Sequence, residues 1–218
     1  MNDPIRVILA DDHTLVRDTL RQWLNNAGDI AVVAEVPSAE AAIDETIRHK
    51  PDVVVMDIDM PGLLCFDAAR TIRARSPETK LLFLSAFFHD RYIEDALGAE
   101  ASGYLTKSEP PEEVVRAIRE VAAGGICFSP EVKARIVIDA QGARLNAEPK
   151  TRAGTLTPRE IEVLRYIARG LSKKDIATTM HISVKTVDNH CTNLMNKLDI
   201  HDRVSLARFA IREGLAEA

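Results

Sequence analysis

The sequence predicts an α/β fold, a doubly wound five-stranded parallel sheet, followed by a second, small all-α domain of four helices. Three observations predict it. Apolar runs of strand length alternate five times with amphipathic stretches of helical length in the first part of the chain. From Leu156 onward only short helical patterns with cap signals remain. The length of 218 residues suits two domains of ordinary size.

Each strand is expected from a nearly continuous apolar run, which is typical of parallel strands buried on both faces. Each helix is expected from apolar residues at helical spacing, and in "LVRDTLRQWL" they are Leu15, Val16, Leu20, Trp23 and Leu24. The strands are expected at Ile5–Ala10, Ile30–Val36, Asp52–Asp57, Lys80–Ala86 and Ser102–Lys107. The helices are expected at Leu15–Leu24, Ser38–His49, Asp67–Arg75, Asp90–Leu97 and Pro110–Ala123.

Five βα units joined by right-handed crossovers favour the flavodoxin-like strand order 2-1-3-4-5. We therefore expect the first domain at residues 1–124. The segment "FSPEVKARIVIDA", residues 128–140, is compatible with one more helix capped by Ser129. Residues 141–155 contain Gly, Pro and charge without periodicity, so residues 125–155 are interpreted as a linker with a possible helix.

The second domain is expected at residues 156–218, and each of its helices begins at a recognisable cap. "TPRE" at Thr157–Glu160 is a capping box with proline at the first helical position. The next helices are expected to begin at Ser172, Ser183 and Asp202. In the third of them, the apolar residues Val184, Val187, Cys191, Leu194 and Leu198 are expected to face the core.

Charge is distributed unevenly between the two domains. The whole chain has a net charge of −5, but Thr155–Ala218 carries 10 Lys and Arg against 8 Asp and Glu, which leaves −7 for the rest. This asymmetry favours different partners for the two domains. Three widely separated cysteines predict neither a metal site nor a disulfide framework. With no leader and no apolar run of bilayer length, we expect a cytoplasmic protein that does not enter a membrane.

Carboxylates gather where the first and third strands end. Asp11 and Asp12 follow the first strand and Asp57 ends the third, and in the expected order these strands are neighbours. A hard divalent cation such as Mg²⁺ would relieve the repulsion between the carboxylates. A carboxylate beside Mg²⁺ can attack a phosphoryl group. Lys107 and Ser85, at the ends of two further strands, could bind phosphoryl oxygens.

Other interpretations stay open from the residues alone. Aspartates after strands also begin turns and cap helices. His13 is either a further ligand or a surface residue of the next helix. "DIDMPG" is also similar to the Asp-x-Asp motif of haloacid-dehalogenase-type phosphotransferases. In those enzymes the motif usually has Thr or Val where Pro61 stands here, and it follows the first strand rather than the third.

Residues from Ile5 to about Ala123 resemble the receiver domain of two-component response regulators. The resemblance is carried by "DDH", "MDIDMPG", "LSA" and "GYLTK". It implies that a sensor histidine kinase phosphorylates Asp57, and that Asp11, Asp12, Asp57 and the main-chain carbonyl of Asp59 hold Mg²⁺. It also implies phosphoryl-contact and switch roles for Ser85, Ala86, Tyr104 and Lys107. Such a protein is not an enzyme in the usual sense, although loss of the phosphoryl group by autodephosphorylation is left open.

This sequence departs from the receiver pattern at two places. Cys65 stands where the family usually has glycine, so the loop after Pro61-Gly62 is expected to be stiffer or reshaped. Glu100 stands where the family often has glycine, at the end of a helix. Neither departure touches the carboxylates.

Residues Leu156–Leu215 resemble the LuxR-type DNA-binding domain, and the two domains together resemble the NarL/FixJ class. The resemblance is carried by "LTPREIEVLRYIARGLSKKDIATTMHISVKTVDNH" and "LMNKLDIHDRVSLARFAI". It implies helix-turn-helix binding to double-stranded DNA, with paired half-sites bound by a homodimer. DNA contacts are expected from Lys173, Lys185, Thr186, Asp188, Asn189, His190, Thr192, Asn193 and Lys197.

Asp188 supports an alternative function for the second domain. The family often has lysine at this place, and a carboxylate facing DNA repels phosphate, although it could accept a hydrogen bond from cytosine. The alternative is a protein-interaction module whose helices no longer bind DNA.

Overall fold

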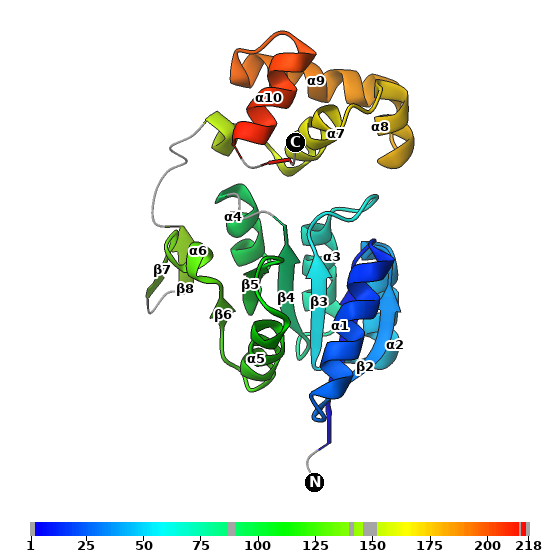
Figure 1. The fold of residues 1–218 in the computed structure, drawn as a ribbon, viewed down its shortest axis with the longest axis vertical. Helices are drawn as coiled ribbons and strands as arrows, with labels where there is room; N and C mark the ends of the chain where they lie inside the picture. The colour runs from blue at the N-terminus through cyan, green and yellow to red at the C-terminus, as the bar shows by residue number, and fades with distance from the viewer. Residues whose placement is uncertain (1–2, 87–89, 140–141, 146–151, 214, 217–218) are drawn as a thin grey trace. The chain divides into compact units, whose positions relative to one another are not determined.

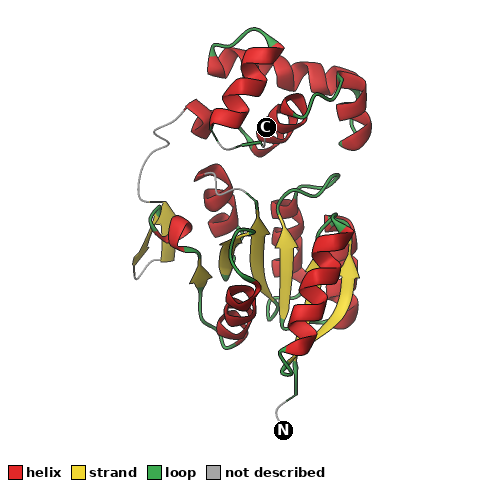
Figure 2. Ribbon diagram, in the orientation of Figure 1, coloured by secondary structure: helices red, strands yellow, loops and turns green. Residues whose placement is uncertain are grey.

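The chain forms two compact units, one made mainly of residues before Leu145 and the other mainly of residues from Leu145 onward (Figures 1 and 2). The structure is a computed structural model and describes residues 3–86, 90–139, 142–145, 152–213 and 215–216. The helices in this part of the chain all fall short of the length and apolar character that crossing a bilayer requires.

The first unit is a doubly wound parallel sheet, as predicted. Its strands are β1 (Ile5–Ala10), β2 (Ile30–Val36), β3 (Val53–Asp57), β4 (Lys80–Ser85), β5 (Gly103–Thr106) and β6 (Cys127–Phe128), in the order β2-β1-β3-β4-β5-β6. Its main helices are α1 (Thr14–Asn26), α2 (Ala39–His49), α3 (Cys65–Arg75), α4 (Asp90–Gly98) and α5 (Pro111–Ala122). In Figure 1, α1 and α5 cover one face of the sheet, and α2, α3 and α4 cover the other.

Strand register brings the functional strand ends to one edge of the sheet. Ala10 of β1 lies beside Met56 of β3, so Asp11 and Asp57 follow in adjacent positions. On the other side of β3, Asp57 pairs with Leu84, which precedes Ser85. Ser85 in turn pairs with Thr106, which precedes Lys107. The central strands are almost wholly buried, because helices pack on both faces.

The expected helix at residues 128–140 is wrong for most of its length. Within residues 128–139, which the structure describes, only Pro130–Lys133 is helical (α6), where Pro130 suits the first turn. Phe128 instead belongs to the two-residue strand β6, which extends the predicted five-stranded sheet to six strands. Ile136–Asp139 and Gly142–Leu145 pair as strands β7 and β8 of a separate two-stranded sheet. The β-branched run Ile136-Val137-Ile138 favours the strand over the helix.

The buried face of α1 also differs from the one predicted. Leu24 is buried and Leu20 and Ala27 pack against the same core, but Leu15 and Trp23 are exposed. The packed residues recur at steps of four and three, which is one stripe of a helix; Leu15 lies off that stripe, and Trp23 lies at its edge. The prediction counted every apolar residue, and the predicted buried face of α1 was therefore too wide.

The second unit contains the four predicted helices. They are α7 (Pro158–Ala168), α8 (Lys173–Thr179), α9 (Val184–Leu198) and α10 (Arg203–Arg212), preceded by a short 3₁₀ helix, η1, at Arg152–Thr155. Side chains of Thr157, Ser172, Ser183 and Asp202 cap the four helices. Val187, Cys191, Leu194 and Leu198 of α9 are buried as expected, but Val184 is 41% exposed. It is the first residue of the helix and lies beyond the packed surface.

Candidate functional site

Asp57 lies at the centre of an acidic cluster at the carboxyl edge of the sheet. Asp57 and Asp11 are both buried, and Asp12 beside them is partly exposed. One ligand atom from each of Asp11, Asp12, His13 and Asp57 lies within 4.8 Å of the others. The carboxylates that the sequence predicted to meet therefore do meet.

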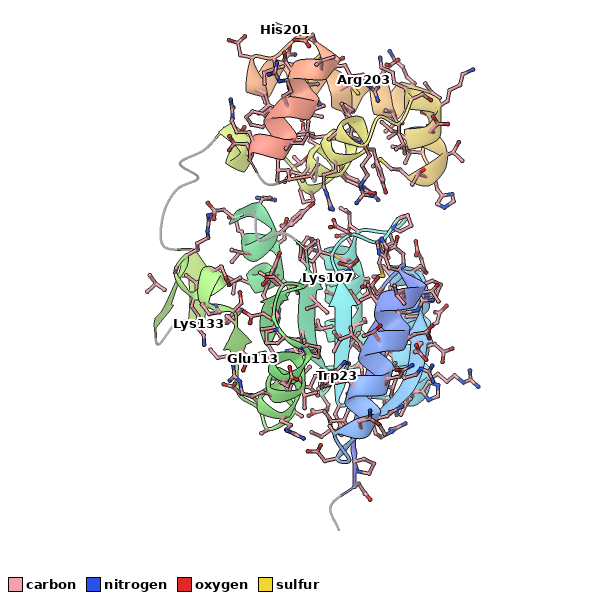
Figure 3. All side chains as sticks on the ribbon, in the orientation of Figure 1. Trp23, Lys107, Glu113, Lys133, His201 and Arg203 are labelled. Carbon is pink, nitrogen blue, oxygen red and sulfur yellow. The ribbon has the colours of Figure 1, made fainter. Side chains whose placement is uncertain are left out.

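Lys107 is the cation of this cluster, and Figure 3 labels it at the strand ends. Its Nζ donates a hydrogen bond to Asp11 Oδ2 at 2.7 Å and lies 2.8 Å from Asp57 Oδ2. The Lys107 amide also donates to the Ser85 carbonyl at 2.7 Å, which anchors the residue at the end of β5. One ammonium thus bridges the carboxylates of two neighbouring strands.

Burial and charge act in opposite directions on Asp57. Burial raises its pKa to about 6, the Lys107 ammonium opposes the rise, and the Asp11 carboxylate adds to it. At Lys107, burial would lower the pKa, but the Asp57 and Asp11 carboxylates outweigh it and the pKa is raised. The ammonium is therefore charged at neutral pH, and the carboxylate of Asp57 is ionised but poorly solvated.

One oxygen of the buried carboxylate could accept a further positive partner. Asp57 Oδ1 is buried and accepts no hydrogen bond from the described residues. An oxygen in this state is costly unless something satisfies it. A hard cation with a preference for carboxylate oxygens fits this position, because Asp11 and Asp12 supply the neighbouring ligands. The residues present therefore fit Mg²⁺.

His13 and Arg17 surround the two N-terminal aspartates. The backbone amide of His13 donates to Asp11 Oδ1 at 2.8 Å, and its Nδ1 lies 2.8 Å from Asp12 Oδ1. The side chain of His13 is more than half exposed. Arg17 donates from its guanidinium to the Asp11 carbonyl and to the Thr14 hydroxyl. Arg17 was missed by sequence reasoning, although a cation one turn into a helix that follows an acidic pair is a visible signal.

Ser85 and Tyr104 lie together in the interior beside this cluster. Both are fully buried, and their hydroxyls are hydrogen-bonded. Burial raises the pKa of Tyr104, so its hydroxyl stays protonated. The Tyr104 ring lies 6.4 Å from that of Phe83 on the neighbouring strand. Ala86, the next predicted contact residue, is exposed at the end of β4.

The loop after β3 is fastened to α2. Glu40 Oε1 accepts a hydrogen bond from the Leu63 amide at 2.8 Å, and Gly62 adopts a left-handed φ of 94° beside the same carboxylate. Asp59, whose carbonyl is expected to hold the metal, lies in the segment between β3 and this contact. Cys65, at the usual glycine position, is the buried first residue of α3.

The second unit presents a polar helix face opposite its buried one. Lys185, Asn189, Thr192 and Asn193 are exposed on α9, and Thr186, Asp188 and His190 are partly exposed. A four-residue turn, Met180–Ser183, joins α8 to α9, with His181 at a left-handed φ of 53°. This helix-turn-helix arrangement gives α9 the place of the recognition helix.

Lys197 has a partner within the unit. Its Nζ lies 2.7 Å from Oε2 of Glu160, which is buried in the capping box of α7. The ammonium also donates to the Thr155 carbonyl at 3.3 Å. Hydrogen bonds from Lys197 and Thr157 outweigh burial and lower the pKa of Glu160. Lys197 therefore ties α9 to α7, a structural role that the sequence pattern did not indicate.

Comparisons with known proteins match both units. Residues 7–119 match the response regulator receiver domain, and residues 154–210 match the bacterial regulatory proteins of the luxR family. The transcriptional regulatory protein YxjL of Bacillus subtilis is 36% identical over 215 residues, with 99% of each chain covered. The response regulator VraR of Staphylococcus aureus is 32% identical over 216 residues, with 98% of this chain and 99% of VraR covered.

A solved structure has the same fold over almost the whole chain. It is RcsB of Salmonella enterica serovar Typhimurium, bound to the rprA promoter in the presence of phosphomimetic BeF₃⁻. The TM-score is 0.64 at 22% identity, with 95% of this chain and 98% of that chain covered.

Proposed function

Because the chain belongs to the two-component response regulators, with a receiver domain and a luxR-family DNA-binding domain, we propose that Asp57 is its phosphoryl acceptor. The observation that carries the proposal is the placement of the Asp57 carboxylate. It is buried, paired with Lys107 and adjacent to Asp11 and Asp12. The protein is a transcriptional regulator, and the proposed chemistry is the input to that regulation.

The donor in this proposal is the phosphohistidine of a sensor histidine kinase. An ionised Asp57 oxygen attacks the phosphorus, the P–N bond to the imidazole breaks, and a P–O bond to Asp57 forms. Lys107 stays beside the acceptor and neutralises the phosphoryl oxygens. Asp11, Asp12, Asp57 and the Asp59 carbonyl would hold Mg²⁺, which when bound neutralises charge on the transferring phosphoryl group.

The switch in this proposal acts through Ser85 and Tyr104. The phosphoryl group adds roughly −1.5 to −2 charges and several strong acceptors beside Ser85. The Ser85 hydroxyl, which is hydrogen-bonded to Tyr104, can turn to satisfy one of these acceptors. The aromatic ring is buried against β4, so a change at Ser85 alters the packing at β5.

The output in this proposal is sequence-specific binding of double-stranded DNA by a homodimer on paired half-sites. α9 supports it by exposing amides, hydroxyls and a lysine at the spacing of one helix face. The RcsB structure, which has the same fold, contains a promoter, and this supports the proposed binding of DNA. Hydrolysis of the acyl phosphate by water would end the signal and restore the Asp57 carboxylate. Asp59 is a candidate to set the rate of this autodephosphorylation.

Labelling with acetyl phosphate tests the receiver part. We expect an acid-stable, hydroxylamine-sensitive label that requires Mg²⁺ and is lost in Asp57→Asn. An equal label in Asp57→Asn would exclude Asp57 as the acceptor. Steady hydrolysis of phosphoesters, beyond a single stoichiometric transfer, would instead favour the haloacid-dehalogenase-type alternative.

Sizing and footprinting of the labelled protein test the output. We expect a shift towards a dimer and protection of two half-sites about one helical turn apart. Protection of no DNA at low salt would support the interaction-module alternative for the second domain.

A further inference from the structure

Asp188 is the anionic residue on the polar face of the recognition helix, and the structure gives it a partner outside that helix. Asp188 Oδ1 lies 2.5 Å from Nζ of Lys173, the first residue of α8. The pair therefore joins the two helices of the helix-turn-helix at their solvent side. Both side chains remain partly exposed, at 41% for Asp188 and 50% for Lys173.

The start of α8 is held in place independently of this pair. Ser172 and Asp175 form a capping box, with Asp175 accepting from the Ser172 amide at 3.1 Å. Arg203 of α10, labelled in Figure 3, donates to the Leu171 carbonyl. Because the backbone around Lys173 is fixed, loss of the ion pair would release the Lys173 side chain without unfolding the helix.

Each member of the pair acts on the charge of the other. The hydrogen bond from Lys173 lowers the pKa of Asp188, and that from Asp188 raises the pKa of Lys173. Both groups are thus charged at neutral pH, and the pair is neutral as a unit. Lys185, one turn before Asp188 on the same helix, also attracts the carboxylate. Asp188 therefore opposes two of the cations predicted to contact DNA.

The consequence for DNA binding follows from counterion release. Each lysine that neutralises a phosphate adds about 0.9 to the steepness of log K against log salt concentration, whatever the DNA sequence. A lysine that is already neutralised by a carboxylate adds little. Limiting this sequence-independent attraction widens the difference between the correct site and all other DNA.

We propose that Asp188 is a specificity determinant, which holds Lys173 in an ion pair and so limits binding to DNA of unrelated sequence. The inference rests on the DNA binding proposed above. It also accounts for a carboxylate on a DNA-binding face, because the carboxylate meets phosphate as half of a neutral pair.

Salt titrations of the full-length protein with a labelled duplex of scrambled sequence test the proposal. Fluorescence anisotropy gives the slope of log K against log salt for wild type, Asp188→Asn, Lys173→Gln and the double variant. We expect Asp188→Asn to bind more tightly at low salt and to steepen the slope by about 0.9. Lys173→Gln alone should leave the slope unchanged. In the double variant, Lys173→Gln should remove the increase in slope that Asp188→Asn causes.

Asp199→Asn is the matched control. Asp199 lies in the same domain with its side chain 81% exposed, and asparagine tolerates its left-handed φ of 53°. This variant changes the net charge by the same amount but releases no lysine from an ion pair. It should leave the slope at the wild-type value. Equal slopes for Asp188→Asn and Asp199→Asn would overturn the proposal.

Two further outcomes separate the possible failures. Lys173→Gln could reduce the slope by the same amount in the wild-type background and in the Asp188→Asn background. That result would show that Lys173 already contacts phosphate in the wild type, and it would overturn the proposal. Selection from a random-sequence duplex pool gives the second readout. We expect Asp188→Asn to enrich a weaker consensus at all positions, whereas loss of one base position alone would mean that Asp188 reads a base. Failure of every variant, wild type included, to bind any duplex would refute the DNA-binding function itself.

Discussion

At the scale of a single residue, the carboxylate of Asp57 must meet two opposing requirements. As the proposed phosphoryl acceptor it must be ionised, yet it is 2% exposed and lies beside another buried carboxylate. Lys107 offsets part of the cost, but burial still prevails and the pKa is raised to about 6. The ionised carboxylate of Asp57 is therefore destabilised when no metal is bound, which favours the binding of a cation beside it.

Replacing Asp57 by asparagine should stabilise the metal-free protein at neutral pH. The folded pKa of about 6 exceeds the unfolded value of about 3.9, so folding becomes less favourable as pH rises from about 4 to about 6. We expect Asp57→Asn to gain about 1–3 kcal/mol of unfolding free energy at pH 7, at roughly 1.4 kcal/mol per unit of pKa, and to lose this gain towards pH 4.

Urea denaturation in EDTA at several pH values measures this effect. Asp18→Asn, which removes a half-exposed carboxylate of α1, is the control and should show no comparable gain. A gain for Asp57→Asn that stays constant from pH 7 to pH 4 would contradict the explanation.

Glu100 shows how a residue can occupy a position that suits glycine. Its φ is 54°, in the left-handed region, and its carboxylate lies 2.8 Å from Arg73. The left-handed conformation costs about 1–2 kcal/mol for a residue with a side chain. The backbone therefore keeps the turn, and the cost is strain at this one residue.

The backbone strain at Glu100 can be measured by comparing two variants that both lose the ion pair. Glu100→Gln keeps the strain, whereas Glu100→Gly removes it but adds about 0.5–1 kcal/mol of unfolded-state entropy. We expect Glu100→Gly to be more stable than Glu100→Gln by about 0.5–1 kcal/mol in chemical denaturation. Equal stabilities would mean that the turn is not strained.

At the scale of elements, the pattern of apolar residues predicted the strands that are packed between two layers of helices. The strands β1, β3 and β4 were found because helices on both faces require nearly continuous apolar runs. β6 was missed because two residues carry no period. The stretch after α6 was wrongly predicted to be helical. Ser129 and Pro130 predict where a helix starts, but the β-branched run in β7 (Ile136–Asp139) was given too little weight.

The contact between Glu40 and the loop after β3 links two elements that the sequence places far apart. We expect Glu40→Ala to leave the Leu63 amide without its acceptor, to cost about 0.5–1.5 kcal/mol of stability, and to speed hydrogen exchange at that amide. Glu45→Ala is the control, because Glu45 lies on the same helix but pairs with Arg48 and His49. Equal exchange at Leu63 in both variants would show that Glu40 does not restrain the loop.

At the scale of the whole molecule, each unit has its own core and its own ligand chemistry. We expect calorimetry to resolve two unfolding transitions, only one of which Mg²⁺ shifts. Mg²⁺ in roughly 100-fold excess over its dissociation constant should add about 2.7 kcal/mol to the receiver transition. Asp12→Asn should weaken this shift. A shift of both transitions by Mg²⁺ alone would contradict the assignment of the ion to the receiver site.

The residues of the candidate site that follow strand ends could be predicted from the sequence. The ion pairs between side chains of different helices could not. Parallel strands end at one edge, so Asp11, Asp57 and Lys107 had to meet. Nothing in the sequence says that Asp188 reaches Lys173 or that Lys197 reaches Glu160. Those pairings depend on helix packing, and they involve three of the residues expected to contact DNA, Lys173, Asp188 and Lys197.

The two-residue strand β6 also has a consequence for how molecules of this protein meet one another. It covers β5, and Gly103 permits this approach because a Cβ there would come within 2.4 Å of the Cys127 carbonyl. An uncovered β5 would offer unpaired amides and carbonyls to a strand of another molecule. So short an added strand leaves little edge to template further pairing. The sheet therefore ends within its own chain, which guards the protein against aggregation through this edge.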